Sequence, residues 1–185
     1  MTQLTPVHPA VVRLDRIAGA IFDLDSVVAT TASAHARDWT RMFDAAAYPA
    51  TVQLIRDLRR HRVRTAIVAA GRHCEKILAA AGVTQLFDAC VDGIDADRWG
   101  TPGGLGPTTF ELAAQHLEVA PSRCAVVEEG LGEALDGLRD FGMVIGIDRT
   151  GDRTALLHEH GADAVVHNLT EVRLADPTTP PSPNM

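Results

Sequence analysis

Short apolar segments typical of strands alternate along this chain with longer amphipathic segments typical of helices, and this alternation limits the possible folds more than any other feature. The segments predicted as strands are 19–23, 64–69, 89–91, 123–128, 143–147 and 164–166. The segments predicted as helices are 33–46, 50–60, 72–81, 108–117, 132–141 and 153–160. Strands that alternate with helices pair in parallel through right-handed crossovers, so we expect a three-layer α/β/α fold with a mostly parallel sheet.

Two stretches rich in proline or glycine interrupt the alternation. Residues 93–107 are predicted as a long loop, and the end of the chain, which holds four prolines, is predicted to be disordered. We therefore expect an N-terminal segment over 1–17, one core domain over 18–173 and a proline-rich tail over 174–185. A length of 185 residues is sufficient for one domain with a full hydrophobic core.

Composition excludes several kinds of partner. The formal net charge of −7 argues against nucleic acid or an anionic membrane surface. No apolar run is long enough to span a bilayer, and the first residues do not have the pattern of a secretory signal. The three cysteines are odd in number and widely spaced, which is typical of reduced core residues, so we expect a cytoplasmic protein.

Two aspartates follow the first predicted strand. Asp23 ends the apolar run and Asp25 comes two residues later, in what is predicted to be a loop. Folds of this class place their chemistry at the carboxyl ends of the strands. One aspartate can serve there as a nucleophile or metal ligand while the other acts as acid or base. The alternative interpretation is a strand end with a solvated turn.

Several short motifs recur in a characteristic order. The run FDLDSVV at 22–28 resembles the pattern hhhhDxDGV, and HARDW at 35–39 resembles H-x-x-x-W. Further matches lie at 48–49, 74–82, 87–88, 91–93, 107–110, 125–130 and 161–166. Together these residues resemble the haloacid dehalogenase superfamily of phosphohydrolases, in its β-phosphoglucomutase-like branch, from about residue 18 to 172. The resemblance implies a Rossmann-like core.

The resemblance also implies a reaction. Asp23 would attack a phosphoryl group and form an aspartyl-phosphate, and Asp25 would protonate the leaving oxygen and then activate water. Mg²⁺ would be held by Asp23, the backbone carbonyl of Asp25, Glu128 and Glu129, since a hard cation prefers oxygen ligands. An alternative interpretation of the two glutamates is a charged helix start.

The residues expected to contact phosphate depart from the family pattern. The candidates are Ser26 and Val27 after the first strand, and Ala69, Ala70 and Arg72 after the second. The second strand ends without the usual hydroxyl, because Ala69 stands where the family has Ser or Thr.

Three further positions differ from the family. Gly104 stands where the family has Lys, Ser26 where it has Gly, and Glu129 where it has Asp. Arg72 and Lys76 are then the only basic candidates near the site. Losing one contact to the charge of the transition state commonly costs ~2.7–4 kcal/mol, or 10²–10³ in rate.

The helical cap domain of this branch is absent from the sequence. It would lie between Trp39 and Tyr48, which are separated only by residues 40–47. An open site suits a phosphorylated small molecule or macromolecule, or a partner protein that supplies a lid. Two functions are therefore expected: a divergent Mg²⁺-dependent phosphatase or phosphomutase-like enzyme of low activity, or a catalytically impaired descendant with a binding or regulatory role. A phosphorylated receiver domain is a weaker third hypothesis, since its lysine and hydroxyl are missing.

Overall fold

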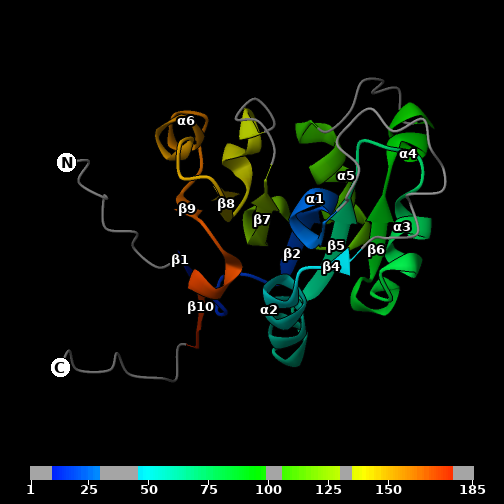
Figure 1. Cartoon of the computed structure of the whole chain (residues 1–185), viewed down its shortest axis with the longest axis horizontal. Coiled ribbons are helices and arrows are strands. Elements are labelled where there is room, and N and C mark those ends of the chain that lie inside the picture. The colour runs from blue at the N-terminus through cyan, green and yellow to red at the C-terminus, as the bar shows by residue number, and fades with distance from the viewer. Residues whose placement is uncertain (1–9, 30–45, 99–105, 130–134, 177–185) are drawn as a thin grey trace.

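A six-stranded parallel sheet forms the centre of the molecule in the computed structural model, which describes residues 10–29, 46–98, 106–129 and 135–176. The strand order is β6-β5-β2-β7-β8-β9, and Figure 1 shows these strands side by side from right to left. Their bounds are β2 Gly19–Asp23, β5 Arg64–Val68, β6 Ala89–Val91, β7 Cys124–Glu128, β8 Met143–Ile147 and β9 Ala164–Val166. All five strand pairs are parallel, so the predicted α/β fold is confirmed.

Helices cover both faces of this sheet. Four of these helices are α2 Pro49–Arg60, α3 Cys74–Ala80, α5 Pro107–His116 and α6 Thr154–Glu159. Helix α4 is described below. Alternate residues of β2 point to opposite faces: Phe22 belongs to a core cluster that includes residues of α2 and α3, whereas Ile21 belongs to a second cluster that includes residues of α5 and α6. Each face therefore has its own apolar core, and β2, at the middle of the sheet, is buried on both sides.

The predicted strands match the observed ones within one residue. β5 ends one residue earlier than predicted and β7 begins one residue later; the other four begin and end where predicted. A strand buried on both faces is an uninterrupted apolar run, so its limits are clear in the sequence.

Two predictions about the connecting segments are wrong. Gly93–Arg98, predicted as loop, forms helix α4, whose first turn is capped by Asp92: the Ile94 N–H donates to Asp92 Oδ1 over 2.8 Å. The helix predicted over 132–141 is, in its described part, a set of short turns that includes the 3₁₀ turn η5 (Leu138–Asp140). The helix predicted over 33–46 lies outside the described residues, except for Ala46.

Two small strand pairs lie beside the main sheet. β1 (Ala10–Arg13) pairs in parallel with β10 (Val172–Ala175), and β3 (Val28–Ala29) pairs antiparallel with β4 (Ala46–Ala47). The first pair joins the expected N-terminal segment to residues on both sides of the expected boundary at 173. Residues 177–185, which hold the tail prolines, lie outside the described part of the chain. In the part that is described, no helix is both long enough and apolar enough to cross a membrane.

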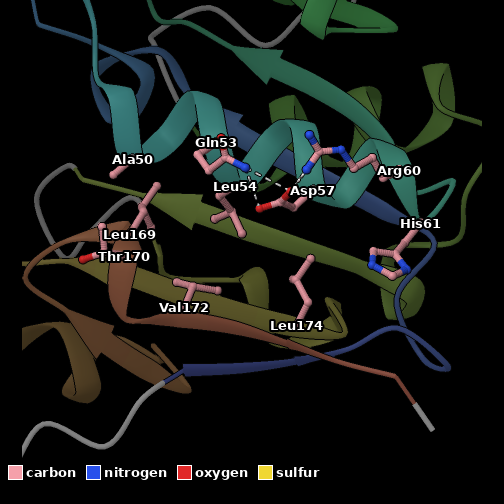
Figure 2. Close-up of a pocket in the computed structure, with 10 residues that line it drawn as sticks. All are labelled: Ala50, Gln53, Leu54, Asp57, Arg60, His61, Leu169, Thr170, Val172 and Leu174. Atoms are coloured by element: carbon pink, nitrogen blue, oxygen red, sulfur yellow. Dashed lines mark hydrogen bonds and ion pairs between the residues drawn. The ribbon is translucent and has the colours of Figure 1, made fainter. Parts of the chain in front are cut away.

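A groove separates α2 from the segment that leads into β10 (Figure 2). Its volume is about 550 Å³, and its lining includes the apolar side chains of Leu54, Val172 and Leu174 and the ion pair between Asp57 and Arg60. None of the predicted site residues lines it, so the groove is separate from the site considered next.

Candidate functional site

Asp23 lies at the carboxyl end of β2 with only 2% of its surface exposed. Backbone N–H groups hold both oxygens of its carboxylate: Asp25 N donates to Oδ1 over 2.8 Å and Glu129 N donates to Oδ2 over 3.0 Å. Burial raises the pKa of Asp23 to about 7; the charges of Asp25 and Glu129 act in the same direction, while the two hydrogen bonds oppose it. The side chain is thus fixed in orientation and costly to ionise.

A single helical turn follows Asp23, where a loop was expected. This turn is α1 (Leu24–Val27), and the carboxylate of Asp23 caps it. Asp25 is exposed on this turn, and loss of hydration raises its pKa above the ordinary value. The two aspartates therefore differ in environment: one is buried and held by the backbone, and the other faces solvent.

Ser26 and Val27 are both buried in this turn. The Ser26 hydroxyl donates to the Asp23 carbonyl over 2.6 Å, and the Ser26 carbonyl accepts from Thr51 Oγ1 of α2 over 2.9 Å. These bonds tie α1 to the strand before it and to α2. Phosphate contacts from these two residues would come from the backbone, because their side chains are packed inward.

The turn after β5 contains the other predicted phosphate contacts. Ala69 is buried and carries no hydroxyl, whereas Ala70 and Arg72 are exposed. The turn is fixed from the neighbouring strand, since Ala69 N donates to Val91 O and Gly93 N donates to Gly71 O, over 3.0 and 2.9 Å. Gly104, the position of the missing lysine, lies outside the described residues.

The two glutamates come from the strand on the other side of β2. Phe22 pairs with Val127, so the next residues, Asp23 and Glu128, lie side by side at the ends of β2 and β7. Glu128 is 1% exposed. Glu129 follows Glu128, and its backbone N–H donates to Asp23. The Glu129 carboxylate takes no part in this bond and has a different partner.

Arg149 is the basic residue at this site that the sequence prediction missed. Its Nε and Nη2 donate to the two carboxylate oxygens of Glu129 over 2.6 and 2.8 Å, and its guanidinium lies 3.9 Å from the centre of the Tyr48 ring. Burial alone would lower the pKa of Arg149, but the charges of Glu129 and Asp23 raise it. The prediction that Arg72 and Lys76 are the only basic candidates is therefore wrong. The available signal was that Arg149 follows a strand end, like the other site residues.

Asp148 fixes the loop that presents Arg149. Its buried carboxylate accepts hydrogen bonds from the backbone N–H groups of Gly151 and Arg153 and from the hydroxyls of Thr150 and Thr154. Burial would raise the pKa of Asp148, but these bonds outweigh it and hold the pKa at about 2. Asp148 is thus a loop anchor whose hydrogen-bonding capacity is already in use.

One of the carboxylates predicted to bind a divalent cation is paired with an arginine. Both oxygens of the Glu129 carboxylate are held by Arg149, and in the described part of the chain no group of three or more His, Cys, Asp or Glu side chains is placed to hold a metal ion. Asp23 and Glu128 place two further carboxylates at adjacent strand ends. Mg²⁺ keeps several waters and binds proteins through one or two carboxylates, so these two residues fit it chemically.

Comparison with known proteins places the chain among hydrolases. A family model described as haloacid dehalogenase-like hydrolase matches residues 40–142, which is more than half of the chain. The chain is 33% identical over 169 residues to trehalose-phosphate phosphatase of Mycobacterium leprae, an alignment that covers 89% of this chain and 34% of that protein. It is 36% identical over 110 residues to β-phosphoglucomutase of Mycobacterium bovis, covering 58% of this chain and 42% of that protein. The chain thus spans less than half the length of either relative.

A solved structure supports the same fold. A haloacid dehalogenase family hydrolase from Deinococcus radiodurans, crystallised with bound phosphate and sodium, aligns with a TM-score of 0.66 at 21% identity. The alignment covers 84% of this chain and 93% of that chain. At this level of identity the likeness extends to the fold and not further.

Proposed function

The chain belongs to the haloacid dehalogenase-like hydrolase family, and from this membership we propose that it is a phosphohydrolase that acts through a covalent phosphate on Asp23. The observation that carries the proposal is the carboxylate of Asp23, buried at the end of the central strand and oriented by two backbone N–H groups. We propose a phosphorylated small molecule of the sugar phosphate class as substrate, because relatives of this chain are a trehalose-phosphate phosphatase and a β-phosphoglucomutase.

The first step assigns the two aspartates different tasks. An oxygen of ionised Asp23 attacks phosphorus, and the bond from phosphorus to the leaving oxygen breaks. Asp25 gives its proton to that oxygen; the raised pKa of this carboxyl favours the protonated form that the step requires. In the second step Asp25 takes a proton from water, which attacks phosphorus, releases phosphate and restores Asp23.

The ionised form of Asp23 requires support from positive charge, because burial favours the neutral acid. We propose that Mg²⁺, held by Asp23, the Asp25 carbonyl and Glu128, supplies this charge and screens the repulsion between carboxylate and phosphate when it is bound. The sequence prediction also included Glu129, whose carboxylate is already paired with Arg149. Asp23 and Glu128 are therefore the side chains on which the proposed cation site depends.

We expect the reaction to be slow. Ala69 offers no hydroxyl to the phosphate, and the turn after β5 brings only Arg72 as a charged side chain. Each missing contact to the charge that develops in the transition state costs on the order of 10²–10³ in rate. A second function, a binding or regulatory role without turnover, is favoured by the same substitution, because Ala69 lacks a contact that hydrolysis of a phosphate ester would use.

We further propose that the site lacks a cap domain. β3 and β4 are joined by residues 30–45, far fewer than the ~50 residues of a small domain. Access to Asp23 would then be open, so a larger phosphorylated substrate or a partner that covers the site would fit as well.

Cys74, Cys90 and Cys124 are free thiols, which supports a reducing, cytoplasmic setting.

A panel of sugar phosphates tests the proposal. Wild-type protein with Mg²⁺ should release inorganic phosphate from at least one member, and Asp23→Asn should abolish this release while leaving the fold unchanged by circular dichroism. Asp140→Asn, which removes an exposed aspartate from η5, is the matched control and should keep full activity. No release from any member by folded wild-type protein would favour the non-catalytic function.

A further inference from the structure

We propose that Arg149 is a positioning residue that withholds Glu129 from the divalent cation and thereby lowers the affinity of the site for it. This inference rests on the proposed function, because it concerns the cation that would support Asp23. Neither the family membership nor the sequence motifs indicate such a role, since Arg149 lies outside every motif on which the resemblance was based.

The pairing of Arg149 with Glu129 is geometrically complete. Two parallel N–H···O bonds of 2.6 and 2.8 Å occupy both carboxylate oxygens, which is the bidentate arrangement favoured by the planar guanidinium. The side chains of Arg149 and Glu129 are only 28% and 18% exposed, so solvent screens the pair less than it would a surface pair. A cation that recruited Glu129 would have to break two charge-assisted bonds.

Contacts on both sides hold the pair in place. The guanidinium lies over the ring of Tyr48, at the start of α2, 3.9 Å from its centre. The backbone beneath it is held by Asp148, which accepts from Gly151 N and Arg153 N over 2.8 and 2.9 Å. On the other side, Glu129 N is bonded to Asp23. Arg149 therefore cannot turn away without losing its contact with Tyr48, and the backbone segments that carry both side chains are held in place.

The electrostatic effect acts in the same direction as the geometric one. The positive charge of Arg149 interacts with both Glu129 and Asp23, the residue proposed to ligate the cation. A fixed positive charge near a cation site repels the cation, and it also neutralises Glu129, which would otherwise attract it. Removal of Arg149 should therefore strengthen cation binding, whereas removal of a residue that positions a true ligand weakens it.

The test is the affinity for Mg²⁺ alone, measured at pH 8 by titration calorimetry on protein treated with EDTA, without substrate. Arg149→Gln should bind Mg²⁺ about tenfold more tightly than wild type, because Glu129 is released and one positive charge is lost. Arg149→Lys should show a smaller gain, since an ammonium group cannot hold both oxygens in the bidentate geometry. Arg149→Gln combined with Glu129→Gln should lose the gain.

Arg153→Gln is the matched control. Arg153 is also 28% exposed and pairs with Asp148 at 3.9 Å, so the variant removes the same charge from the same loop without releasing Glu129. Its affinity should stay within about twofold of wild type. Circular dichroism and thermal unfolding verify that each variant is folded, and Arg149→Lys decides the question if Arg149→Gln is not.

Equal or weaker Mg²⁺ binding by the Arg149 variants would overturn the inference, and so would a gain of the same size in Arg153→Gln. The result is independent of turnover. If the affinities follow the expected order but no phosphate ester is hydrolysed, the proposed function fails and the inference about Arg149 stands. If turnover is found and Arg149→Gln binds no more tightly, the inference alone fails.

Discussion

Asp23 carries an energetic cost that the rest of the fold offsets. Its carboxylate is buried between β5 and β7, and burial raises its pKa to about 7. Two backbone N–H groups partly replace the lost water. Such a residue destabilises the ligand-free protein when it is ionised, which is a common property of catalytic groups placed for a substrate or cation.

The stability of the ligand-free protein should therefore fall as pH rises. A carboxyl with a raised pKa in the folded state keeps its proton when the unfolded chain has lost it, so its contribution is largest near pH 4 and is lost by about pH 7. Between pH 5 and 8 the free energy of unfolding should drop by about 2–3 kcal/mol from this group. Urea unfolding in the presence of EDTA, carried out across this pH range, measures the change in the free energy of unfolding.

Asp23→Asn should remove most of this pH dependence, whereas Asp140→Asn, an exposed control, should keep it. Equal slopes for wild type and Asp23→Asn would show that burial of Asp23 does not control the stability of the free protein. The same measurement with saturating Mg²⁺ should reduce the slope, because a bound cation favours the ionised carboxylate.

Part of the candidate site follows from the sequence at the level of single residues. Asp23 and Glu128 end apolar runs, so their places at the ends of β2 and β7 were predictable. The partner of the Glu129 side chain was not predictable from the sequence. Arg149 lies twenty residues further along, and its contact with Glu129 depends on β8 being the neighbour of β7, which no local pattern specifies.

At the scale of secondary-structure elements, the turns at the strand ends determine the shape of the site. The turn after β5 packs against the start of α4, where a Cβ atom added to Gly93 would lie 2.8 Å from the Ala70 carbonyl oxygen. That atom belongs to the backbone and cannot rotate aside. The tight contact explains why α4 begins with glycine, a residue that also made the sequence look like a loop.

Gly93→Ala should push the turn that carries Ala70 and Arg72 away from β6. We expect the free energy of unfolding to fall by about 1–3 kcal/mol, as in other overpacked sites. Gly71→Ala is the matched control, because nothing lies within 4 Å of its added Cβ, and it should change stability by less than about 1 kcal/mol. Urea unfolding of both variants measures the difference. Equal stabilities would show that the turn yields easily.

The segments between the strands were harder to predict than the strands. A helix capped by Asp92 and begun by glycine has a weak helical signal. The apolar periodicity over 132–141 predicts a helix, but the described part of this segment, 135–141, forms separate short turns. Tertiary packing against the sheet decides whether such a segment forms a helix or separate turns. Short elements have too few residues for a periodicity that would indicate the outcome.

At the scale of the whole molecule, the strand order brings the parts of the site together. Residues at or just after the carboxyl ends of β2, β7 and β8 meet only because these strands are neighbours, although they are far apart in the sequence. The ends of the described chain meet as well, through the pairing of β1 with β10, where Ala10 and Val12 are buried. Four-residue strands outside the main alternation gave no clear periodicity, so this closure was not predictable.

Chemical trapping of the covalent phosphate tests directly whether Asp23 is the nucleophile. Protein turning over the best sugar phosphate is quenched and reduced with borohydride, which converts an aspartyl-phosphate to homoserine, and the tryptic peptide 17–37 is sequenced by mass spectrometry. If Asp23 is the nucleophile, the modification is found at Asp23 and is absent from Asp25 and from the Asp23→Asn variant. Turnover without modification of Asp23, or modification of another residue, would contradict this assignment.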